Sequence, residues 1–308
     1  MSHCFHRLAT AALAASHAMA QVPADLVDKI AAIGRVSDPA KTGPLYVPMH
    51  AKEPYAGVKV ARDLKYGAHE RQVLDLFVRE GMAAGRPVFM FVHGGGFVRG
   101  TKRAPGSPFY DNIMLWAVKN GMIGVNVEYR LAPQFSWPSG GEDLGMAVRW
   151  VADNAGAHGG DPNRVYMMGH SAGATHVALY VSHPEFHGPK GSGLDGAMFS
   201  SGMYDLTKVE GSDGQKEYFG TDRALYKERS ALPGLLKTSI PFMANAAELD
   251  PQWMVDQLND LKAAMCETRG CIRTLLQPKH NHMSQSYAIG TSDTLLTGQI
   301  LEFIKTGK

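Results

Sequence analysis

Two short motifs, each placed after an apolar run, carry residue types that together perform acyl transfer. The first is His-Gly-Gly-Gly-Phe at residues 93–97, and the second is Gly-His-Ser-Ala-Gly at residues 169–173. The second has the G-x-S-x-G spacing of a nucleophile elbow, which places a serine on a tight turn between a strand and a helix. Because residues 165–168 are typical of a strand and 172–181 of a helix, we predict that Ser171 is a nucleophile. The alternative interpretation is an ordinary Gly-Ser turn.

The glycine run of the first motif indicates a site for a developing negative charge. Attack on a carbonyl group creates an alkoxide, which preorganised backbone N–H groups stabilise. Glycines allow a backbone to approach a substrate closely. We therefore predict oxyanion-hole donors at Gly95, Gly96 and Ala172. A flexible turn is one alternative; a phosphate-binding loop is another, but no Lys-Ser or Lys-Thr pair follows at the required spacing.

A carboxylate that orients a catalytic histidine is expected downstream of the serine. Residues 241–247 form a predicted strand, which is followed by Glu248, Leu249, Asp250 and Pro251. Asp250 lies past the strand end, where it would stabilise an imidazolium, so we predict it as the acid, with Glu248 as its rival. The alternative role of Asp250 is that of a helix N-cap, because aspartate is favoured there and proline follows it.

The predicted base lies in the last loop between a strand and a helix. This loop follows the predicted strand 272–276 and contains both His280 and His282. An imidazole at this place can take the serine proton and later deliver it to the leaving group. We predict His282 as the base, with His280 as its rival.

Four further side chains are candidates for the wall of a substrate pocket. Phe97 and His170 belong to the two motifs, and Trp137 and Trp253 are further aromatic candidates. Packing in the core or at the rim is the alternative role of these residues.

Strand and helix patterns alternate along most of the chain. This alternation predicts an α/β fold, with a mostly parallel central sheet flanked by helices. The predicted strands are 72–78, 88–92, 122–129, 165–168, 197–200, 241–247 and 272–276. The predicted helices are 112–119, 140–155, 172–181, 253–265 and 295–304, and residues 25–33 form a short amphipathic stretch. Residues 207–239 are more polar and irregular, which indicates an insertion over the C-terminal edge of the sheet.

The composition fits one large globular domain. The chain has 308 residues, of which 44% are hydrophobic and 19% charged, enough apolar material for a sizeable core. The net charge is +2 and no run of like charges occurs, so a nucleic-acid partner is not expected. The apolar run near the N-terminus is too short to cross a bilayer, and no membrane span is predicted.

Residues 1–20 have the pattern of a secretory signal peptide. A positive charge at Arg7 precedes the apolar run 8–15, and Ala18-Met19-Ala20 fits a cleavage site. We predict a signal peptide at 1–20, an N-terminal cap-like segment at 21–65, and a catalytic domain at 66–308. The protein is then secreted or periplasmic; an Ala-rich start of a cytoplasmic protein is the alternative.

Two cysteines would remain after removal of such a signal. Cys266 and Cys271 are separated by a short loop, and an oxidising compartment favours a disulfide between them. The alternative is two unrelated thiols. Neither cysteine has neighbouring cysteine or histidine pairs at zinc-site spacing, so no metal is predicted.

At these motifs the sequence resembles the α/β-hydrolase superfamily, and within it the hormone-sensitive-lipase-like bacterial carboxylesterases. The resemblance covers about residues 65–305. Besides the two glycine motifs, it is carried by Tyr-Arg-Leu-Ala-Pro at 129–133, Gly-Asp-Pro-Asn-Arg-Val at 160–165, Ala-Glu-Leu-Asp-Pro at 247–251 and His-Asn-His at 280–282. It implies an α/β-hydrolase fold whose second strand is antiparallel, a triad of Ser171, Asp250 and His282, and no cofactor.

The elbow departs from the spelling that is common in that family. His170 stands where the family usually has Asp, and Ala174 stands where a second glycine is usual. This spelling also resembles kynurenine-formamidase-type and short-chain esterase relatives.

The sequence therefore predicts a carboxylesterase-type serine hydrolase whose partner is a small-molecule ester with a short acyl group. An amidase or formamidase and an acetyl esterase for decorated sugars are alternatives, because they share the triad. A non-catalytic binding protein on the same fold would lack part of the triad, and a metal-dependent hydrolase would need a motif such as H-E-x-x-H, which is absent. A homodimer is compatible with the sequence.

Overall fold

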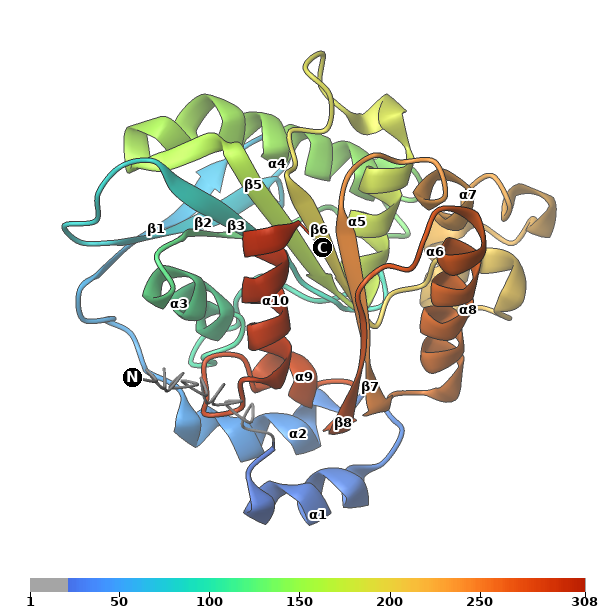
Figure 1. Ribbon diagram of the computed structural model, residues 1–308, viewed down its shortest axis with the longest axis horizontal. Coiled ribbons are helices and arrows are strands. Elements are labelled where there is room, and N and C mark those ends of the chain that lie inside the picture. The colour runs from blue at the N-terminus through green and yellow to red at the C-terminus, as the bar shows by residue number, and fades with distance from the viewer. Residues whose placement is uncertain (1–21, 308) are drawn as a thin grey trace, which may run out of the picture.

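The computed structural model describes residues 22–307, so the predicted signal peptide lies outside the described residues. Within them, eight strands form one sheet in the order β1-β2-β4-β3-β5-β6-β7-β8 (Figure 1). Strand β2 runs antiparallel to both β1 and β4, and the remaining neighbours run parallel. The predicted α/β fold, with its mostly parallel sheet and antiparallel second strand, is confirmed.

The element bounds follow the predicted alternation closely. The strands are β1 (Val58–Lys65), β2 (Val73–Arg79), β3 (Arg86–Val92), β4 (Ile123–Val127), β5 (Gly160–His170), β6 (Gly196–Ser200), β7 (Phe242–Leu249) and β8 (Thr274–Asn281). The helices are α1 (Ala24–Ile33), α2 (Pro39–Tyr46), α3 (Asp111–Lys119), α4 (Ser139–Asn154), α5 (Ala172–Ser182), α6 (Asp213–Phe219), α7 (Leu232–Leu235), α8 (Gln252–Thr268), α9 (Ser284–Tyr287) and α10 (Leu295–Thr306).

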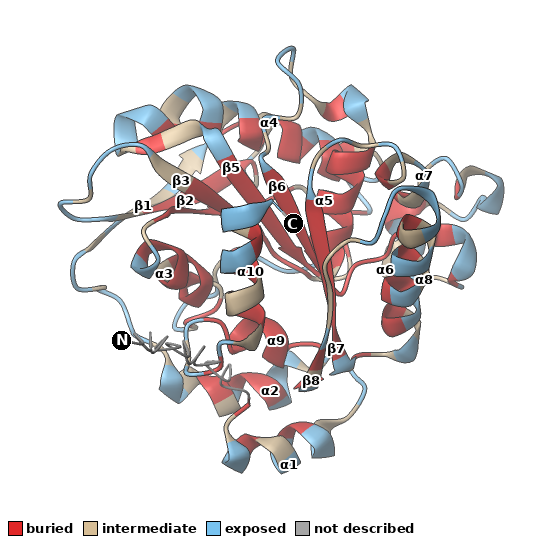
Figure 2. Cartoon of the chain, viewed as in Figure 1, coloured by how far each residue is buried: buried red, intermediate tan, exposed pale blue. Residues whose placement is uncertain are grey.

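Helices cover both faces of the sheet, which buries its central strands (Figure 2). On one face, Ile113 of α3 and Ile300 of α10 pack with Phe89 of β3. On the other face, Val177 of α5 and Leu258 of α8 belong to a larger buried cluster that also includes α4. Because both faces are covered, the inner strands read as continuous apolar runs.

Strand β1 corrects the predicted boundary at residue 66. Residues 21–65 were predicted as a cap-like segment, but Val58 pairs with Arg79 and Lys65 with Val73 in the antiparallel β1–β2 ladder. The sheet therefore begins before residue 66. Side chains of β1 are exposed or half-buried, because it is an edge strand. Charged residues on such an edge discourage pairing with other chains, and they also weaken the apolar signal of a strand.

The first two helices pack at the end of the sheet that carries the loops after β7 and β8 (Figure 1). Leu26 and Ile30 of α1 and Tyr46 of α2 form a buried cluster with Met283 and Tyr287, which follow β8. Helix α2 begins at a proline after Asp38, whose side chain accepts a hydrogen bond from a backbone N–H of the first turn. The N-terminal segment thus supports the loop that contains the predicted base.

The irregular region 207–239 lies beside the glycine motif. It contains helices α6 and α7, and the Tyr218 ring of α6 stacks on Phe97 with 5.0 Å between ring centroids. The predicted insertion at the C-terminal edge of the sheet therefore lies at the edge where the motifs are.

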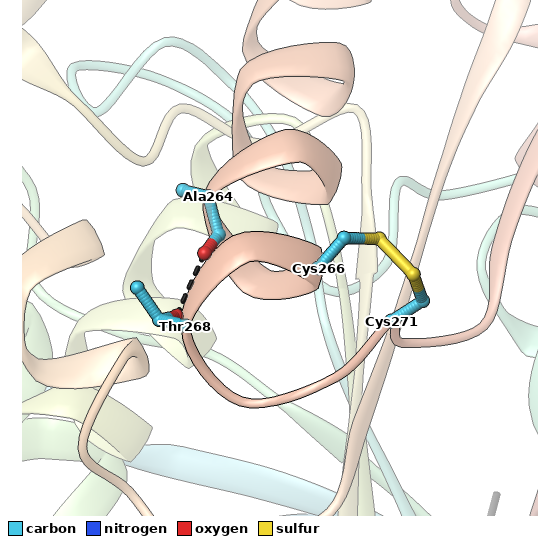
Figure 3. The surroundings of a disulfide bond; sticks show 4 residues. All are labelled: Ala264, Cys266, Thr268 and Cys271. Atoms are coloured by element: carbon cyan, nitrogen blue, oxygen red, sulfur yellow. Dashed lines mark hydrogen bonds between the residues drawn. A yellow bond between two sulfur atoms is a disulfide. The ribbon is translucent and has the colours of Figure 1, made fainter.

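Cys266 and Cys271 form a disulfide, the pairing that the sequence favoured (Figure 3). Cys266 lies near the end of α8, and Cys271 lies in the loop before β8. The bond therefore ties the end of a helix to the connection that enters the last strand. In residues 22–307, none of the helices has the length and apolar character needed to cross a membrane.

Candidate active site

Ser171 occupies the sharp turn between β5 and α5, with φ 58° and ψ −124°. A positive φ is uncommon for a residue with a side chain, and such strain persists where the surrounding structure enforces it. Here the Ser171 N–H donates to the Ser200 carbonyl at 2.9 Å, and the Ser171 carbonyl accepts from the Thr175 N–H at 3.1 Å. The turn therefore presents the serine at the carboxyl end of the sheet, as a nucleophile elbow does.

The two elbow glycines are required by close packing. A Cβ on Gly169 would lie 2.3 Å from the Gly173 carbonyl oxygen, and a Cβ on Gly173 would lie 2.2 Å from the Val92 carbonyl oxygen. Neither position can hold a side chain without moving backbone. The glycines thus bring the start of α5 against the end of β3, next to the glycine loop.

The start of the glycine loop is fixed by hydrogen bonds of the buried residues His93 and Glu128. His93 is fully buried, with Nε2 2.7 Å from Oε1 of Glu128 and Nδ1 2.7 Å from the Gly94 carbonyl oxygen. Each ring nitrogen of His93 therefore has a hydrogen-bond partner within the fold. The Tyr129 hydroxyl donates to the His93 carbonyl at 2.8 Å. These contacts fix the start of the loop.

Gly95 and Gly96 have positive φ values of 139° and 61°, and both line the same cavity as Ser171 and Ala172. Ala172 is the first residue of α5, where the backbone N–H groups have no partner within the helix. The loop and the helix start therefore offer N–H groups on one side of the serine, as expected of an oxyanion hole.

Asp250 and His282 form a buried pair across the loops after β7 and β8. Nδ1 of His282 lies 2.7 Å from Oδ1 of Asp250, so the imidazole N–H donates to the carboxylate. Burial raises the pKa of Asp250, but His282, the Ser201 hydroxyl and the Ala247 N–H lower it by more. The net pKa lies below the ordinary value, and the carboxylate is ionised at neutral pH.

The two rival residues have other partners. Glu248 is exposed and accepts a hydrogen bond from the Lys279 N–H at 2.6 Å. His280 is buried between Asp293, with Nε2 2.8 Å from Oδ2, and Ser284, with Nδ1 2.9 Å from Oγ. Its ring nitrogens are therefore both used within the fold, whereas His282 lines the cavity that contains Ser171.

Ser171, Ala172 and His282 line a cavity of about 340 Å³. Its wall includes the glycine loop, the elbow, Met203 and Gln215 from the region after β6, Trp253 of α8, and Pro39 at the start of α2. Helices α2 and α6 thus each contribute a residue to the wall of the cavity that contains Ser171. A pocket of this size suits a small ligand with a few polar anchors.

Of the four predicted pocket residues, the structure places Phe97, His170 and Trp253 in this wall, but not Trp137. The Trp137 ring instead packs edge-on against His183 and Phe186, and lies tilted against Phe219. The prediction for Trp137 was wrong because its half-buried ring packs in an aromatic cluster with His183, Phe186 and Phe219 and does not line the cavity.

His170 is a neutral residue beside the base. Its Nε2–H donates to the His282 carbonyl at 2.9 Å, and Nδ1 has no hydrogen-bond partner among the described residues. Burial and the charge of His282 lower the pKa of His170 to about 3. The ring therefore remains uncharged at neutral pH and adds no second positive charge near the base.

Sequence reasoning missed two polar residues of the site. Ser201 follows β6, lines the cavity and donates its hydroxyl to Oδ2 of Asp250 at 2.5 Å. Gln285 is buried in α9 and donates to Ser201 and to the His282 carbonyl. Neither belongs to a recognised motif; their positions just after the sheet edge, beside the acid and the base, were the available signal.

A family model matches part of this sequence, and a solved structure shares its fold. The BD-FAE family model matches residues 74–190, a range that includes the glycine loop and the elbow. Esterase B from Lactobacillus rhamnosis superposes with a TM-score of 0.71, over 91% of this chain and 94% of that chain, at 17% sequence identity. The chain thus has the α/β-hydrolase fold, and over residues 74–190 it is similar to the BD-FAE family.

Curated relatives of this chain include two esterases of Mycobacterium tuberculosis. It is 29% identical to esterase LipQ over 217 residues, which are 67% of this chain and 50% of the relative. It is 42% identical to carboxylesterase NlhH over 94 residues, which are 30% of this chain and 28% of the relative. The chain thus spans half or less of the length of these relatives.

Proposed function

We propose that this α/β-hydrolase is a serine carboxylesterase that cleaves esters with short acyl groups. Ser171 is the nucleophile, His282 the general base and Asp250 the acid that orients it. The N–H groups of Gly95 and Ala172, with that of Gly96, form the oxyanion hole. The observation that carries the proposal is the pairing of His282 with Asp250 at 2.7 Å, in the cavity that also contains Ser171.

The proposed reaction proceeds in two halves. Oγ of Ser171 bonds to the ester carbonyl carbon while its proton passes to Nε2 of His282. The alkoxide formed on the carbonyl oxygen is stabilised by the loop and helix N–H groups. The carbon–oxygen bond to the alcohol then breaks, and the alcohol leaves with the proton from His282. Water attacks the acyl-serine by the same route, which releases the acid and restores Ser171.

The size of the cavity supports short acyl groups. About 340 Å³ is near the lower end of the range for small-molecule sites. The names of the relatives, esterase and carboxylesterase, support esters over amides. We expect kcat/KM on p-nitrophenyl esters to be highest for acetate to hexanoate and to fall for longer chains.

Hydrolysis of p-nitrophenyl butyrate by the wild type and by Ser171→Ala tests the proposal. Loss of the nucleophile in such a triad lowers kcat by about 10⁶-fold. A matched Ser136→Ala variant, at an exposed loop position, is expected to keep wild-type activity. An inert wild type, or an active Ser171→Ala variant, contradicts the proposal. Turnover of anilides or N-formyl compounds in the absence of ester turnover would favour the amidase alternative.

We further propose that the protein is secreted or periplasmic, with residues 1–20 as a signal peptide. The Cys266–Cys271 disulfide supports an oxidising compartment. The expected result is that the full chain appears in the periplasm with Gln21 as its N-terminal residue, and that a chain without residues 1–20 stays in the cytoplasm. An uncleaved full chain in the cytoplasm contradicts it. We also propose that the protein forms a homodimer. Sedimentation equilibrium tests this proposal, because it distinguishes the mass of one chain from that of two.

A further inference from the structure

Gln285 is a buried amide whose hydrogen-bonding capacity is fully used. Its Nε2 donates to Oγ of Ser201 at 2.6 Å and to the His282 carbonyl at 3.0 Å. Its Oε1 accepts from Oγ of Ser200 at 2.8 Å and from Nδ2 of Asn245 at 2.9 Å. An amide nitrogen has two protons and an amide oxygen two lone pairs, so this side chain has one defined orientation.

Ser201 has its hydroxyl proton assigned by these contacts. Nε2 of Gln285 can only donate, so Oγ of Ser201 accepts from it and must direct its own proton to Oδ2 of Asp250, 2.5 Å away. The backbone supports this direction: Ser201 has φ 54°, and its N–H donates to the Asn245 carbonyl at 2.7 Å. The hydroxyl is therefore held on the acid by a strained backbone.

The contacts of Asp250 divide between its two oxygens. Oδ1 accepts from Nδ1 of His282, while Oδ2 accepts from the Ser201 hydroxyl and from the Ala247 N–H at 2.7 Å. The carboxylate is buried, so its orientation depends on these donors. Loss of the Ser201 hydroxyl would leave a single donor on Oδ2 and would free the carboxylate to rotate away from the imidazole.

We propose that Gln285 and Ser201 are positioning residues that hold the acid and the base as one unit. Gln285 contacts the acid through Ser201 and the base through the His282 carbonyl. A change at either contact therefore reaches both members of the pair. The proposal rests on the proposed function, since it assigns Asp250 and His282 as acid and base.

The carbonyl oxygen of the Gln285 side chain contacts two neighbouring strands, at Ser200 of β6 and Asn245 of β7. Ser200, Asn245 and Gln285 close a ring of hydrogen bonds, in which Nδ2 of Asn245 also donates to Oγ of Ser200 at 2.9 Å. Fully satisfied networks of this kind specify one arrangement of the groups that they contain. Gln285 connects this ring to Asp250 through Ser201 and to His282 through the His282 carbonyl. A fixed orientation of Gln285 therefore fixes the relative positions of the acid and the base.

The test compares steady-state kinetics of Ser201→Ala, Ser201→Gly, Gln285→Met and the Ser201→Ala/Gln285→Met double variant on p-nitrophenyl butyrate. Glycine adopts a positive φ readily, so Ser201→Gly removes the hydroxyl without added backbone strain. Gln72→Met is the matched control, because Gln72 is a buried amide that donates to Asp143 at 2.7 Å outside the cavity.

We expect each single variant at Ser201 or Gln285 to lower kcat about 10- to 100-fold, the value of a hydrogen bond to a charged group, with KM changed less than about twofold. The double variant should lose less than the product of the two single effects, because both residues act on the same Asp250–His282 pair. Gln72→Met should unfold at a lower temperature and keep its kcat.

Four kinetic outcomes overturn the proposal. They are a kcat within twofold of wild type in folded Ser201 and Gln285 variants, a change of KM instead of kcat, fully additive effects, and an equal loss of kcat in Gln72→Met. Each of these outcomes would mean that the network maintains the shape of the cavity or the stability of the fold, and does not position the acid and the base.

A measurement without substrate separates this proposal from the proposed function. In a Ser171→Ala background, the Nδ1 proton of His282 gives a far-downfield NMR signal in ¹⁵N-histidine-labelled protein, assigned by its loss in His282→Gln. We expect this signal to shift or broaden in Ser201→Ala and Gln285→Met, and to persist in Gln72→Met. An unchanged signal in all three overturns the coupling, even if ester hydrolysis is established. A changed signal supports the coupling, even if esters prove not to be the substrate.

Discussion

Nδ1 of His282 lies 2.7 Å from Oδ1 of Asp250, although the two residues are separated by 32 positions in the chain. Parallel strands place the loops at their carboxyl ends along one edge of the sheet, so β7 and β8 deliver these two side chains as neighbours. The other oxygen of Asp250 receives the Ser201 hydroxyl from the loop after β6. Three adjacent loops therefore define the orientation of one carboxylate.

Asp250→Asn is predicted to lower kcat by about 10⁴-fold, because an amide cannot stabilise the imidazolium and favours the wrong tautomer of the base. Glu248→Gln is the control two residues earlier, and it should keep kcat within about twofold, since Glu248 is exposed and contacts Lys279. Initial rates on p-nitrophenyl butyrate measure both. A larger loss in Glu248→Gln would reverse the assignment of the acid.

His282→Gln and His280→Gln should separate chemistry from stability. His282→Gln is expected to abolish turnover in a folded protein, because the proton acceptor is lost. His280→Gln should instead lower the free energy of unfolding by about 1–3 kcal/mol, because it disturbs the buried contacts with Asp293 and Ser284, and should keep kcat. Urea unfolding and activity are measured on the same samples. Loss of kcat in folded His280→Gln would show that the two roles are exchanged.

Glu128 is predicted to make stability depend on pH in the acid range. Burial raises the pKa of Glu128, but His93, Arg71 and the Lys102 N–H lower it by more, to about 2. The folded-state pKa lies below that of the unfolded chain, so this group stabilises the fold above the unfolded-state pKa. That contribution, about 3 kcal/mol, is lost as the pH falls toward 2.

Urea unfolding of the wild type and Glu128→Gln at pH 7, 5, 4 and 3 measures this contribution. The free-energy gap between the two proteins should be largest at pH 7 and should close as the pH falls. The Gln side chain has no carboxyl proton to gain, so it provides the reference for all other groups. If the free energies of unfolding of the two proteins changed in parallel with pH, Glu128 would not contribute to the loss of stability in acid.

The Cys266–Cys271 disulfide is predicted to stabilise the fold without affecting catalysis. It closes a loop of sequence separation five, for which loop entropy gives about 2 kcal/mol. The Cys266→Ser/Cys271→Ser variant should melt about 4 °C lower and keep its kcat, because the bond lies at the opposite end of α8 from Trp253. Dithiothreitol should lower the Tm of the wild type only. A fall in kcat at unchanged Tm is the contrary result.

The alternation of strands and helices and the two glycine motifs could be read from the sequence because they are local. A buried strand such as β3 is a continuous apolar run, and the elbow needs its glycines within five consecutive residues. These patterns determined the fold class, the strand after which Ser171 is presented, and the loops in which an acid and a base were expected. Strand β1 was not predicted, because an edge strand with one solvated side has only a weak apolar pattern.

Contacts between distant residues were decided only by the tertiary structure. The sequence offered Glu248 beside Asp250 and His280 beside His282, and the choice within each pair depends on which side chain turns toward the other loop. Trp137 is an aromatic residue of the type that often lines a pocket, but its ring packs against Phe186 instead. The hydrogen bond that joins Gln285 to Ser201, 84 positions away, cannot be predicted from one sequence, because it depends on position in space and not on spacing in the chain.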